Sequence, residues 1–595
     1  MLTTPAPAPI SYRVAMPAPD DHEYEVTLDV PALPGRDEPV IAFPAWAPGS
    51  YLVRDFVRHV YRLEITDARG RALPAERLDK QRWRVSAGGR PFRVRYRVFA
   101  FETSVRTSFL DGSHAYWNGT SMFFYVEGEQ ARACRIVVAP PPSADWHVDT
   151  ALPPVRGARN TFTAASFDEL ADSPFEVGTH ERRAFNVGRT RFELALYGRT
   201  NADVDRLVDI LRKVVVATGK IFGGKFPFDR YLFIVHALPV GSGGLEHRAS
   251  VTMDITGLQF EDETGYHRFA DLAAHEFFHV WNVKRLRDAT LGPFDYGREN
   301  YTRLLWLHEG FTDYLANVII LRAGVTKEKH FWKWIGEDWP KYAQRPGRNE
   351  TPLTELSFEA WIKLYKPAEN HVNRAVSYYE KGLWVGMALD LTLRLRTNGR
   401  RGLPELFGVL WKRLARKDWV VTEEDVRAAA RELAPRAAGE LDAFFDKYVC
   451  GTDELPLPAL WRRAGVTVRE QAEWQGDDVD PVRAARARAW TGIALFADKT
   501  TIRNVVPGSP AARAGLTFGD EVIAVEGARV NGSTFAKRVA DRRPGERARL
   551  TYFRRDELRE ATLTLAESPE RKWQLSPDQK ASATAKAVRA GWLGV

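Results

Sequence analysis

Several short stretches in the first third of the chain alternate apolar and polar residues. The clearest are residues 24–30, 92–98 and 192–196, each bounded by Gly, Pro or Asp. Successive side chains of a strand point to opposite faces of a sheet, so this two-residue period predicts strands with one buried face. Such strands, separated by turn residues, predict an N-terminal β-sandwich domain, which we place at residues 1–185.

The apolar period changes near Asn201. From there, positions 204, 207, 208, 211, 214 and 215 fall on one helical face, with Asn201 as the expected N-cap. Two short strand-like runs, 231–237 and 249–254, are joined by a glycine-rich turn at 241–244. Helical patterns then continue to residue 448, one of them from 266 to 286. We expect a mostly α-helical domain at residues 186–465.

Polar residues dominate 466–488, which predicts a linker or an exposed helix. Short β-type runs return at 501–506, 521–525, 548–553 and 561–565, with a small helix near Thr534. These patterns predict a β-module at residues 489–566 and a C-terminal tail with helical character at 567–595. The whole chain is therefore expected to be a multidomain α+β protein.

Composition and charge limit the function. The 595 residues carry 85 Lys and Arg against 77 Asp and Glu, a formal net charge of +8, with no run of five basic residues. This small excess does not indicate nucleic acid as a partner. The two cysteines, Cys134 and Cys450, provide neither a disulfide framework nor a cysteine-rich metal site. Any metal must therefore be held by His and carboxylate side chains.

The first ten residues alternate Pro with small residues, where a signal peptide would need a basic start and a continuous apolar stretch. No window approaches the ~18 apolar residues that span a bilayer. The sequence predicts a soluble, cytoplasmic protein with no membrane partner, or a periplasmic one if the start codon is misassigned.

Residues 275–279 read His-Glu-Phe-Phe-His within a helical pattern. His275 and His279 lie four positions apart, so they share a helical face and can bind one Zn²⁺. Glu276 lies beside them, close enough to take a proton from a metal-bound water. The pattern predicts a catalytic centre with one Zn²⁺ per chain and Glu276 as its base.

A tetrahedral zinc needs a third protein ligand, and Glu309 is the candidate. Asp313, at i+4 from Glu309 on the same helical face, could accept the free N–H of a metal-bound His and fix its tautomer. His308 is a rival ligand. We favour Glu309 because Asp313 supplies it with a supporting partner, whereas His308 has none.

These residues resemble a known family. H-E-x-x-H followed by a helix with E-G-x-x-D resembles gluzincin metallopeptidases with a thermolysin-like catalytic domain. The segment 243–247, Gly-Gly-Leu-Glu-His, resembles the G-x-M-E-N signature of zinc aminopeptidases in the form of the glycyl aminopeptidase family. The segment 378–382, Tyr-Tyr-Glu-Lys-Gly, resembles the Y-x-K-G segment of those enzymes. Segments 46–51 and 448–456 are also similar to that family, and 508–516 resembles a PDZ domain.

The resemblance implies a zinc aminopeptidase that releases small N-terminal residues such as Gly or Ala from peptides with a free N-terminus. It implies that Tyr379 donates a hydrogen bond to the oxyanion, with the adjacent Tyr378 as its rival. It also implies that Gly243, Gly244 and Glu246 bind substrate, with Glu246 pairing with the α-ammonium group. The strand at 248–254 is expected to hold the substrate backbone by edge pairing. His247 replaces the Asn of the broader signature.

In the PDZ-like region, one segment stands where such domains bind a peptide carboxylate with backbone N–H groups: Gly492, Ile493, Ala494 and Leu495. A C-terminal peptide is the expected ligand there, and a purely structural module is the alternative.

Two other functions remain open. An endopeptidase would cut peptides whose amine is blocked, and an inactive scaffold would use the PDZ module alone. The five catalytic-centre positions are all present, which argues against the scaffold: His275, Glu276, His279, Glu309 and Tyr379. Nothing in the sequence indicates the oligomeric state.

Overall fold

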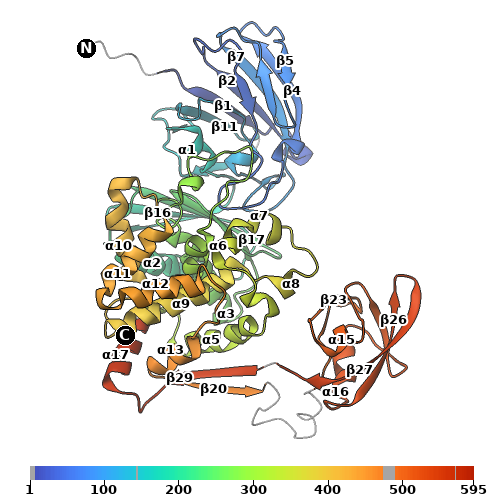
Figure 1. Cartoon of the computed structure of the whole chain (residues 1–595). Coiled ribbons are helices and arrows are strands. Elements are labelled where there is room, and N and C mark those ends of the chain that lie inside the picture. Colours follow the sequence, from blue (N-terminus) through green and yellow to red (C-terminus); the bar gives the residue numbers. More distant parts are fainter. Residues whose placement is uncertain (1–6, 143–144, 473–488, 570, 595) are drawn as a thin grey trace. The chain divides into compact units, whose positions relative to one another are not determined.

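The computed structural model describes residues 7–142, 145–472, 489–569 and 571–594 (Figure 1). The chain divides into two compact units. The first runs to Thr302 and also includes Leu315–Thr326 and Pro404–Val426. The second comprises Arg303–Tyr314, Lys327–Leu403 and the described residues from Arg427 onward. Among the described residues, no helix is long and apolar enough to cross a membrane.

The expected N-terminal β-sandwich is confirmed. A six-stranded sheet has the order β13-β11-β1-β2-β7-β4, and a four-stranded sheet has the order β10-β3-β6-β5. The bounds in the first sheet are β1 Ile10–Ala15, β2 Glu23–Val30, β4 Val60–Asp67, β7 Phe92–Phe99, β11 Cys134–Ala139 and β13 Thr161–Ala164. Those in the second are β3 Val40–Ala42, β5 Ala75–Arg77, β6 Arg82–Val85 and β10 Tyr125–Val126.

The alternation seen in the sequence explains this packing. Along β2, every second side chain from Tyr24 to Val30 is buried, and β7 shows the same pattern from Phe92 to Val98. These side chains join those of the four-stranded sheet, such as Ile41 and Val85, in one continuous core. Burial of one face of each sheet therefore holds the sandwich together.

Two further sheets lie in the first unit. One has the order β12-β14-β9-β8, and the other, with five strands, has the order β15-β16-β17-β19-β18. Their bounds are β8 Ser108–Leu110, β9 His114–Trp117, β12 His147–Thr150, β14 Phe175–Gly178, β15 Glu181–Val187, β16 Thr190–Gly198, β17 Arg230–Leu238, β18 Gly244–Glu246 and β19 Ser250–Thr256. The five-stranded sheet begins with β15, a few residues before the boundary expected at residue 186. Its strand β17 is buried along almost its whole length, as expected for parallel strands covered on both faces.

Helices α2, Val204–Ile221, and α3, Glu263–Phe278, pack against each other beside this sheet. The N-cap of α2 is Asp203, whose carboxylate accepts hydrogen bonds from the N–H groups of Asp205 and Arg206. The expectation that Asn201 caps this helix is wrong. Asn201 instead accepts a hydrogen bond from the N–H group of Phe260, and so anchors the turn that leads to α3.

The rest of the central region is mostly helical, as expected. After the π-helical turn Trp306–Gly310 come α4 Phe311–Arg322, α5 Glu328–Ala343, α6 Leu353–Phe358, α7 Ala360–Lys363, α8 His371–Arg374, α9 Tyr378–Arg396, α10 Leu403–Leu414, α11 Glu423–Leu433, α12 Ala438–Tyr448 and α13 Leu457–Arg463. Tryptophan rings form much of the core of the second unit. Trp339 packs edge-on against both Trp384 and Trp461.

The C-terminal part contains the expected β-module. A four-stranded sheet, β25-β24-β26-β27, and two strand pairs, β21-β28 and β22-β23, surround a core of their own. The bounds are β21 Ala489–Trp490, β22 Ile493–Leu495, β23 Ile502–Val505, β24 Glu521–Val525, β25 Ala528–Arg529, β26 Arg547–Arg554, β27 Glu557–Thr564 and β28 Ala566–Glu567, with helices α15 Pro510–Arg513 and α16 Phe535–Ala540. The expected fold class, β-sandwich, helical domain and β-module, is thus confirmed.

The segment expected as a linker begins with a strand. Residues Val466–Ala472 form β20, which pairs antiparallel with β29, Arg571–Pro577, while 473–488 lie outside the described residues. The expected tail therefore contributes β29 and the helix α17, Ala583–Leu593. In α17, the buried indole of Trp592 donates a hydrogen bond to the hydroxyl of Tyr314, which fixes this helix to the second unit.

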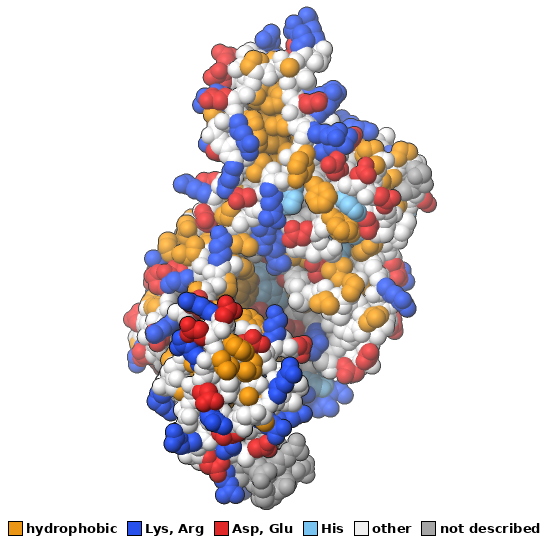
Figure 2. Space-filling model, turned by 90° about the vertical axis from the view of Figure 1, so that its right-hand side faces the viewer, with side chains coloured by type: hydrophobic (Ala, Val, Ile, Leu, Met, Phe, Trp, Pro, Cys, Tyr) orange, Lys and Arg blue, Asp and Glu red, His pale blue; other side chains and the backbone are white. Residues whose placement is uncertain are grey.

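Charged side chains are mixed over the surface. Figure 2 shows Lys and Arg next to Asp and Glu across the face that it draws. Many of them pair between neighbouring strands, as Arg97 does with Glu23 and Glu25. Charges of both signs are thus interspersed on this face of the protein.

Candidate functional site

Helix α3 positions the first half of the site. Asp262 caps its N-terminus by accepting a hydrogen bond from the N–H group of Thr264, and its last turn carries His275 and Glu276. His279 is the first residue after the helix. The Nε2 atoms of His275 and His279 lie 3.0 Å apart, so the two imidazoles do share one face, as their spacing predicts.

The hydrogen bonds of His279 define how it can bind a metal. Its Nδ1 lies 2.7 Å from the carbonyl oxygen of Asn282, so Nδ1 carries the proton and Nε2 keeps a lone pair directed at His275. Two nitrogens bound to one tetrahedral zinc at ~2.0–2.1 Å would lie ~3.3 Å apart. The observed separation therefore fits a shared metal ion.

A strained turn creates this geometry. The helical pattern predicted to continue to residue 286 stops at Phe278, and Val283 adopts φ +113°. Positive φ is strongly disfavoured for a β-branched residue. The turn directs the Asn282 carbonyl at His279, and it brings Lys284 to the carboxylate of Asp172, 2.9 Å away. Side-chain periodicity could not reveal this stop, because apolar residues recur after it at near-helical spacing, at Val280, Val283 and Leu286.

Glu309 lies in the π-helical turn and is almost fully buried. The ligand atoms of His275, His279 and Glu309 all lie within 4.8 Å of one another. Two neutral imidazoles and one carboxylate form a donor set typical of zinc. Glu309 belongs to one of the side-chain groups among the described residues that could hold a metal ion. His308 is also buried but belongs to none of these groups.

A close approach of two glycines brings Tyr379 to Glu309. A Cβ atom built on Gly310 would lie 2.5 Å from the Cα atom of Gly382, and one on Gly382 would lie 2.9 Å from the Cα atom of Gly310. Only glycines allow the π turn and α9 to pack this closely. The glycines of the E-G and K-G motifs thus hold the start of α9 beside the turn that carries Glu309.

Tyr379 and Tyr378 both lie close to Tyr365. Burial and the neighbouring carboxylate of Glu309 raise the pKa of Tyr379 well above its ordinary value, so its phenol stays protonated and can donate a hydrogen bond. The hydroxyl of Tyr378 lies 3.1 Å from that of Tyr365. The selection of Tyr379 over Tyr378 stays a prediction.

Asp313 follows the π turn at the start of α4 and is half-buried. Because the switch from π to α geometry falls between Gly310 and Phe311, the ordinary i to i+4 spacing does not describe how Asp313 lies relative to Glu309. Its role as partner of a metal-bound imidazole stays a prediction.

Glu246 lies at the edge of the five-stranded sheet, in β18, and is 4% exposed. One ligand atom from each of Glu246, Glu276 and His279 lies within 4.8 Å of the others. Gly244 packs so closely that a Cβ atom there would overlap the carboxylate of Glu276. Gly49, from the N-terminal segment 46–51, packs in the same way against Glu246, since a Cβ there would lie 2.5 Å from Oε1.

The expectation that the strand at 248–254 offers a free edge to the substrate is wrong. Residues 250–256 form β19, which lies between β17 and β18 and therefore has no free edge where both neighbours pair with it. The short strand β18, with Gly244 and Glu246, forms the edge instead, while Gly243 adopts φ +109° just before it.

Two residues missed by the sequence reasoning, Lys284 and Asp172, lie near Glu246 together with His247. Lys284 is buried and lies 2.9 Å from Asp172 and 3.9 Å from Glu246. Nδ1 of His247 lies 3.0 Å from the same Asp172 carboxylate. Burial alone would raise the pKa of Asp172, but Lys284 and His247 hold it well below its usual value. No motif marked Lys284 or Asp172, because they are far apart in the sequence.

The predicted carboxylate-binding segment of the β-module spans the start of β22. Gly492 adopts φ +80° and packs against Ser509, which leaves no room for a Cβ atom. The N–H group of Ile493 donates to the hydroxyl of Thr491. Ala494 and Leu495 continue into β22, paired with β23 on one side. Their role in peptide binding stays a prediction.

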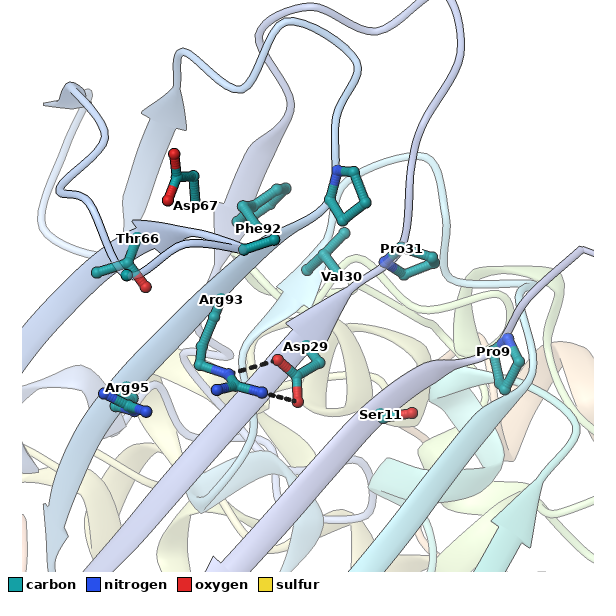
Figure 3. A pocket seen from close by; sticks show the side chains of 13 residues that line it. Pro9, Ser11, Asp29, Val30, Pro31, Thr66, Asp67, Phe92, Arg93 and Arg95 are labelled. Carbon is teal, nitrogen blue, oxygen red and sulfur yellow. Dashed lines mark hydrogen bonds and ion pairs between the residues drawn. The ribbon is translucent and has the colours of Figure 1, made fainter.

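A pocket of about 380 Å³ on the N-terminal sheet lies apart from these residues. Figure 3 shows its lining side chains from β1, β2 and β7, with the guanidinium of Arg93 bound to both oxygens of Asp29. The pocket contains none of the predicted site residues.

Comparisons with known proteins identify the family of the chain. Residues 11–179 match the Peptidase M61 N-terminal domain, residues 268–385 match M61 glycyl aminopeptidase, and residues 465–565 match a PDZ domain. The crystal structure of an aminopeptidase N family protein from Idiomarina loihiensis is 30% identical, with a TM-score of 0.89 over 98% of this chain and 100% of that chain.

An M1 zinc metallopeptidase from Deinococcus radiodurans is 16% identical, with a TM-score of 0.43 over 76% of this chain and 95% of that chain. No curated protein matches the sequence. The family matches fall on the sandwich, on the segment with the H-E-x-x-H and Y-E-K-G motifs, and on the β-module. The chain therefore belongs to the M61 glycyl aminopeptidase family of metallopeptidases and carries a PDZ domain near its C-terminus.

Proposed function

We propose that this chain is a zinc aminopeptidase that removes single residues, small ones such as Gly or Ala, from the N-terminus of peptides. The observation that carries the proposal is the buried carboxylate of Glu246, grouped with Glu276 and His279. A carboxylate buried beside the general base offers a binding place for the α-ammonium group of a substrate. The preference for small residues rests on the family description alone.

His275, His279 and Glu309 would hold the zinc ion, which supplies Lewis-acid polarisation of the scissile carbonyl and lowers the pKa of a water when bound. Glu276 would accept the proton of the attacking water and later deliver it to the leaving amine. Its low exposure, 5%, keeps bulk water away from that proton. Asp313 would act indirectly, by orienting one of the imidazoles.

Tyr379 would stabilise the oxyanion. The raised pKa of its phenol keeps the proton available throughout the reaction. A donor of this kind acts mainly when negative charge develops, and its removal costs ~10²–10³-fold in kcat.

Glu246 would set the position of the cut, because its carboxylate pairs with the free amine one residue before the scissile bond. Gly243 and Gly244 would let the substrate backbone approach the sheet edge at β18, where backbone groups are free of strand pairing on one side. The ammonium group of Lys284, 3.9 Å from Oε1 of Glu246, would help to hold that carboxylate in place.

The domain bounds and the ligand of the PDZ domain are also part of this proposal. We place the sandwich at 1–185, the peptidase domain at 186–465, the linker at 466–488, the PDZ domain at 489–566 and the tail at 567–595. The PDZ domain would bind a C-terminal peptide through Gly492, Ile493, Ala494 and Leu495. The matched PDZ family supports this class of ligand.

The test is an Ala-rich peptide with a free or an acetylated amine, with products identified by mass spectrometry. Stepwise loss of single residues from the free form alone is the expected result. Glu246→Gln should raise KM for the free peptide at least ~10-fold, because the ammonium loses its charged partner. Glu560→Gln, the same change on an exposed strand of the C-terminal module, is the control. Internal cleavage of both peptides would mean an endopeptidase and would refute the role of Glu246.

A further inference from the structure

A second group of buried ionisable side chains lies within the first unit, between the sheet β12-β14-β9-β8 and the five-stranded sheet. It is separate from the H-E-x-x-H residues. Its members come from β9, β12, β14, β17 and β19 and from the turn after β14: His114, Asp149, Glu176, His180, His236 and Asp254. Glu176 is fully buried at their centre.

Two of these histidines are each held by a carboxylate on the far side of the ring. Nδ1 of His236 lies 3.0 Å from Asp254, and Nε2 of His180 lies 2.5 Å from Asp149. A carboxylate that holds one ring nitrogen as N–H leaves the lone pair of the other nitrogen for a metal. Those inner nitrogens both face Glu176, at 3.0 Å for His236 and 3.8 Å for His180.

A third imidazole completes the group. His114 is held by stacking against the rings of Tyr197 and Phe109, with centroids 3.5 Å and 5.0 Å away. Its ring is almost fully buried, with 1% of the residue exposed. Ligand atoms of His114, Glu176 and His236 all lie within 4.8 Å of one another.

Several buried polar atoms here make no hydrogen bond within the protein. Nδ1 of His114, Oε1 of Glu176 and Nδ1 of His180 are buried and make no hydrogen bond. Native proteins rarely bury polar atoms unpaired, because the lost hydration is not replaced. Three such atoms in one place indicate a ligand that accepts lone pairs, which is what a cation does.

We propose that His114, Glu176 and His236 bind a second divalent transition-metal ion, with zinc the best match, in addition to the one at His275, His279 and Glu309. Imidazole nitrogens and one carboxylate oxygen are the donors that zinc prefers. His180, the nearest further donor, is the candidate for the fourth position. A site closed by four protein ligands is typical of structural zinc.

The competing arrangement contains no metal. In it, the ring of His236 bridges two carboxylates, with Nδ1 3.0 Å from Asp254 and Nε2 3.0 Å from Glu176. That arrangement satisfies Oε2 of Glu176 but leaves the unpaired atoms of His114, His180 and Glu176 as they are. The metal accounts for more of the buried polar atoms.

The second ion would stabilise the edge of the sheet that carries Glu246. Asp254, which holds His236, also accepts a hydrogen bond from the N–H group of Val105, and its own N–H donates to the carbonyl of Gly243. The proposed site therefore ties the smaller sheet to β17, β19 and the start of the Gly-Gly-Leu-Glu segment. We assign it a structural role that does not depend on the proposed peptidase activity.

The test is the zinc content of the full-length protein after loading and gel filtration, measured by mass spectrometry of the metal. We expect two zinc ions per wild-type chain and one in the double variant His275→Ala, Glu309→Ala. Adding His114→Phe to that variant should remove the last ion. Phenylalanine keeps the stacking on Tyr197 and Phe109 but lacks the nitrogen. His371→Phe, in α8 and outside the group, should leave one ion bound.

The results separate the possibilities. The proposal is overturned if the double variant binds no zinc, or if its remaining ion survives His114→Phe. A further readout does not need the His114 variant: zinc should raise the Tm of the double variant, as any ligand of the folded state does. An unchanged Tm at saturating zinc would contradict the proposal. Loss of peptidase activity in the double variant tests the first site alone, so failure of one assignment leaves the other intact.

Discussion

The contact between Gly310 and Gly382 offers a direct test of how this fold builds its site. We consider Gly310→Ala, which adds one methyl group to the π-helical turn. The new Cβ atom would lie 2.5 Å from the Cα atom of Gly382 and 2.7 Å from the carbonyl oxygen of Tyr378. These are backbone atoms, so no side chain can rotate away to make room.

The size of the effect follows from these distances. Non-bonded carbon atoms are comfortable at ~3.5–4.0 Å, so the turn and α9 must separate by ~1 Å or more. Glu309 lies in the turn and Tyr379 at the start of α9, so their spacing changes by that amount. A misplacement of ~1 Å can cost ~10²-fold in rate, and overpacking costs ~1–3 kcal/mol in stability. Gly382→Ala, with its closest contacts at 2.9 Å and 3.0 Å, should cost less.

The assay is steady-state hydrolysis of an alanyl chromogenic substrate, together with Tm and zinc content. We expect kcat to fall ~10²-fold in Gly310→Ala. Gly439→Ala is the matched control, because it lies at the start of α12 with nothing within 4 Å of its added Cβ atom. The double variant Gly310→Ala, Tyr379→Phe tests whether the loss of rate comes from displacement of Tyr379. If it does, Gly310→Ala should lower kcat far less when the phenol hydroxyl is already absent. Wild-type kcat and Tm in Gly310→Ala would refute the reasoning.

Three other predictions follow from the site. Glu276→Gln should keep zinc and lose turnover, whereas Glu309→Ala should lose zinc affinity; unchanged metal content in the second variant would exclude Glu309 as a ligand. Asp313→Asn should weaken zinc binding ~10–100-fold, measured by chelator competition, if it orients an imidazole. Asp172→Asn should lower Tm at pH 7. Since the folded pKa of Asp172 is depressed, its contribution exists above the ordinary value of ~4 and is lost below it, so the Tm difference should narrow as the pH falls below ~4.

Local patterns predicted much of this protein because they depend on periods of two and of about four residues. Alternation gave the strands β2 and β7, and the spacing of His275 and His279 predicted a shared face. The same logic failed where the backbone leaves regular geometry. The helix α3 stops at Phe278, and the π turn changes the relation of Glu309 to Asp313. Neither feature alters the hydrophobic pattern.

The sequence could also not distinguish an edge strand from an inner one. The sequence predicted a strand at 249–254 and a turn at 241–244, and only the strand order shows that the short strand β18 lies at the edge while β19 pairs on both sides. Sheet order depends on contacts between segments far apart in the chain, which no local pattern encodes.

By itself, the sequence determined the fold class and the family and predicted one set of metal ligands, because periodicity and motifs of a few neighbouring residues are enough for these. Tertiary structure decided which side chains lie together. It placed Lys284 between Asp172 and Glu246, although Asp172 lies more than 70 residues before Glu246 in the chain. It also packed Gly310 against Gly382. The group of His114, Glu176 and His236 likewise forms only in the folded chain. Buried polar atoms must find partners wherever the chain brings them, so such groups become visible only when distant strands pack together.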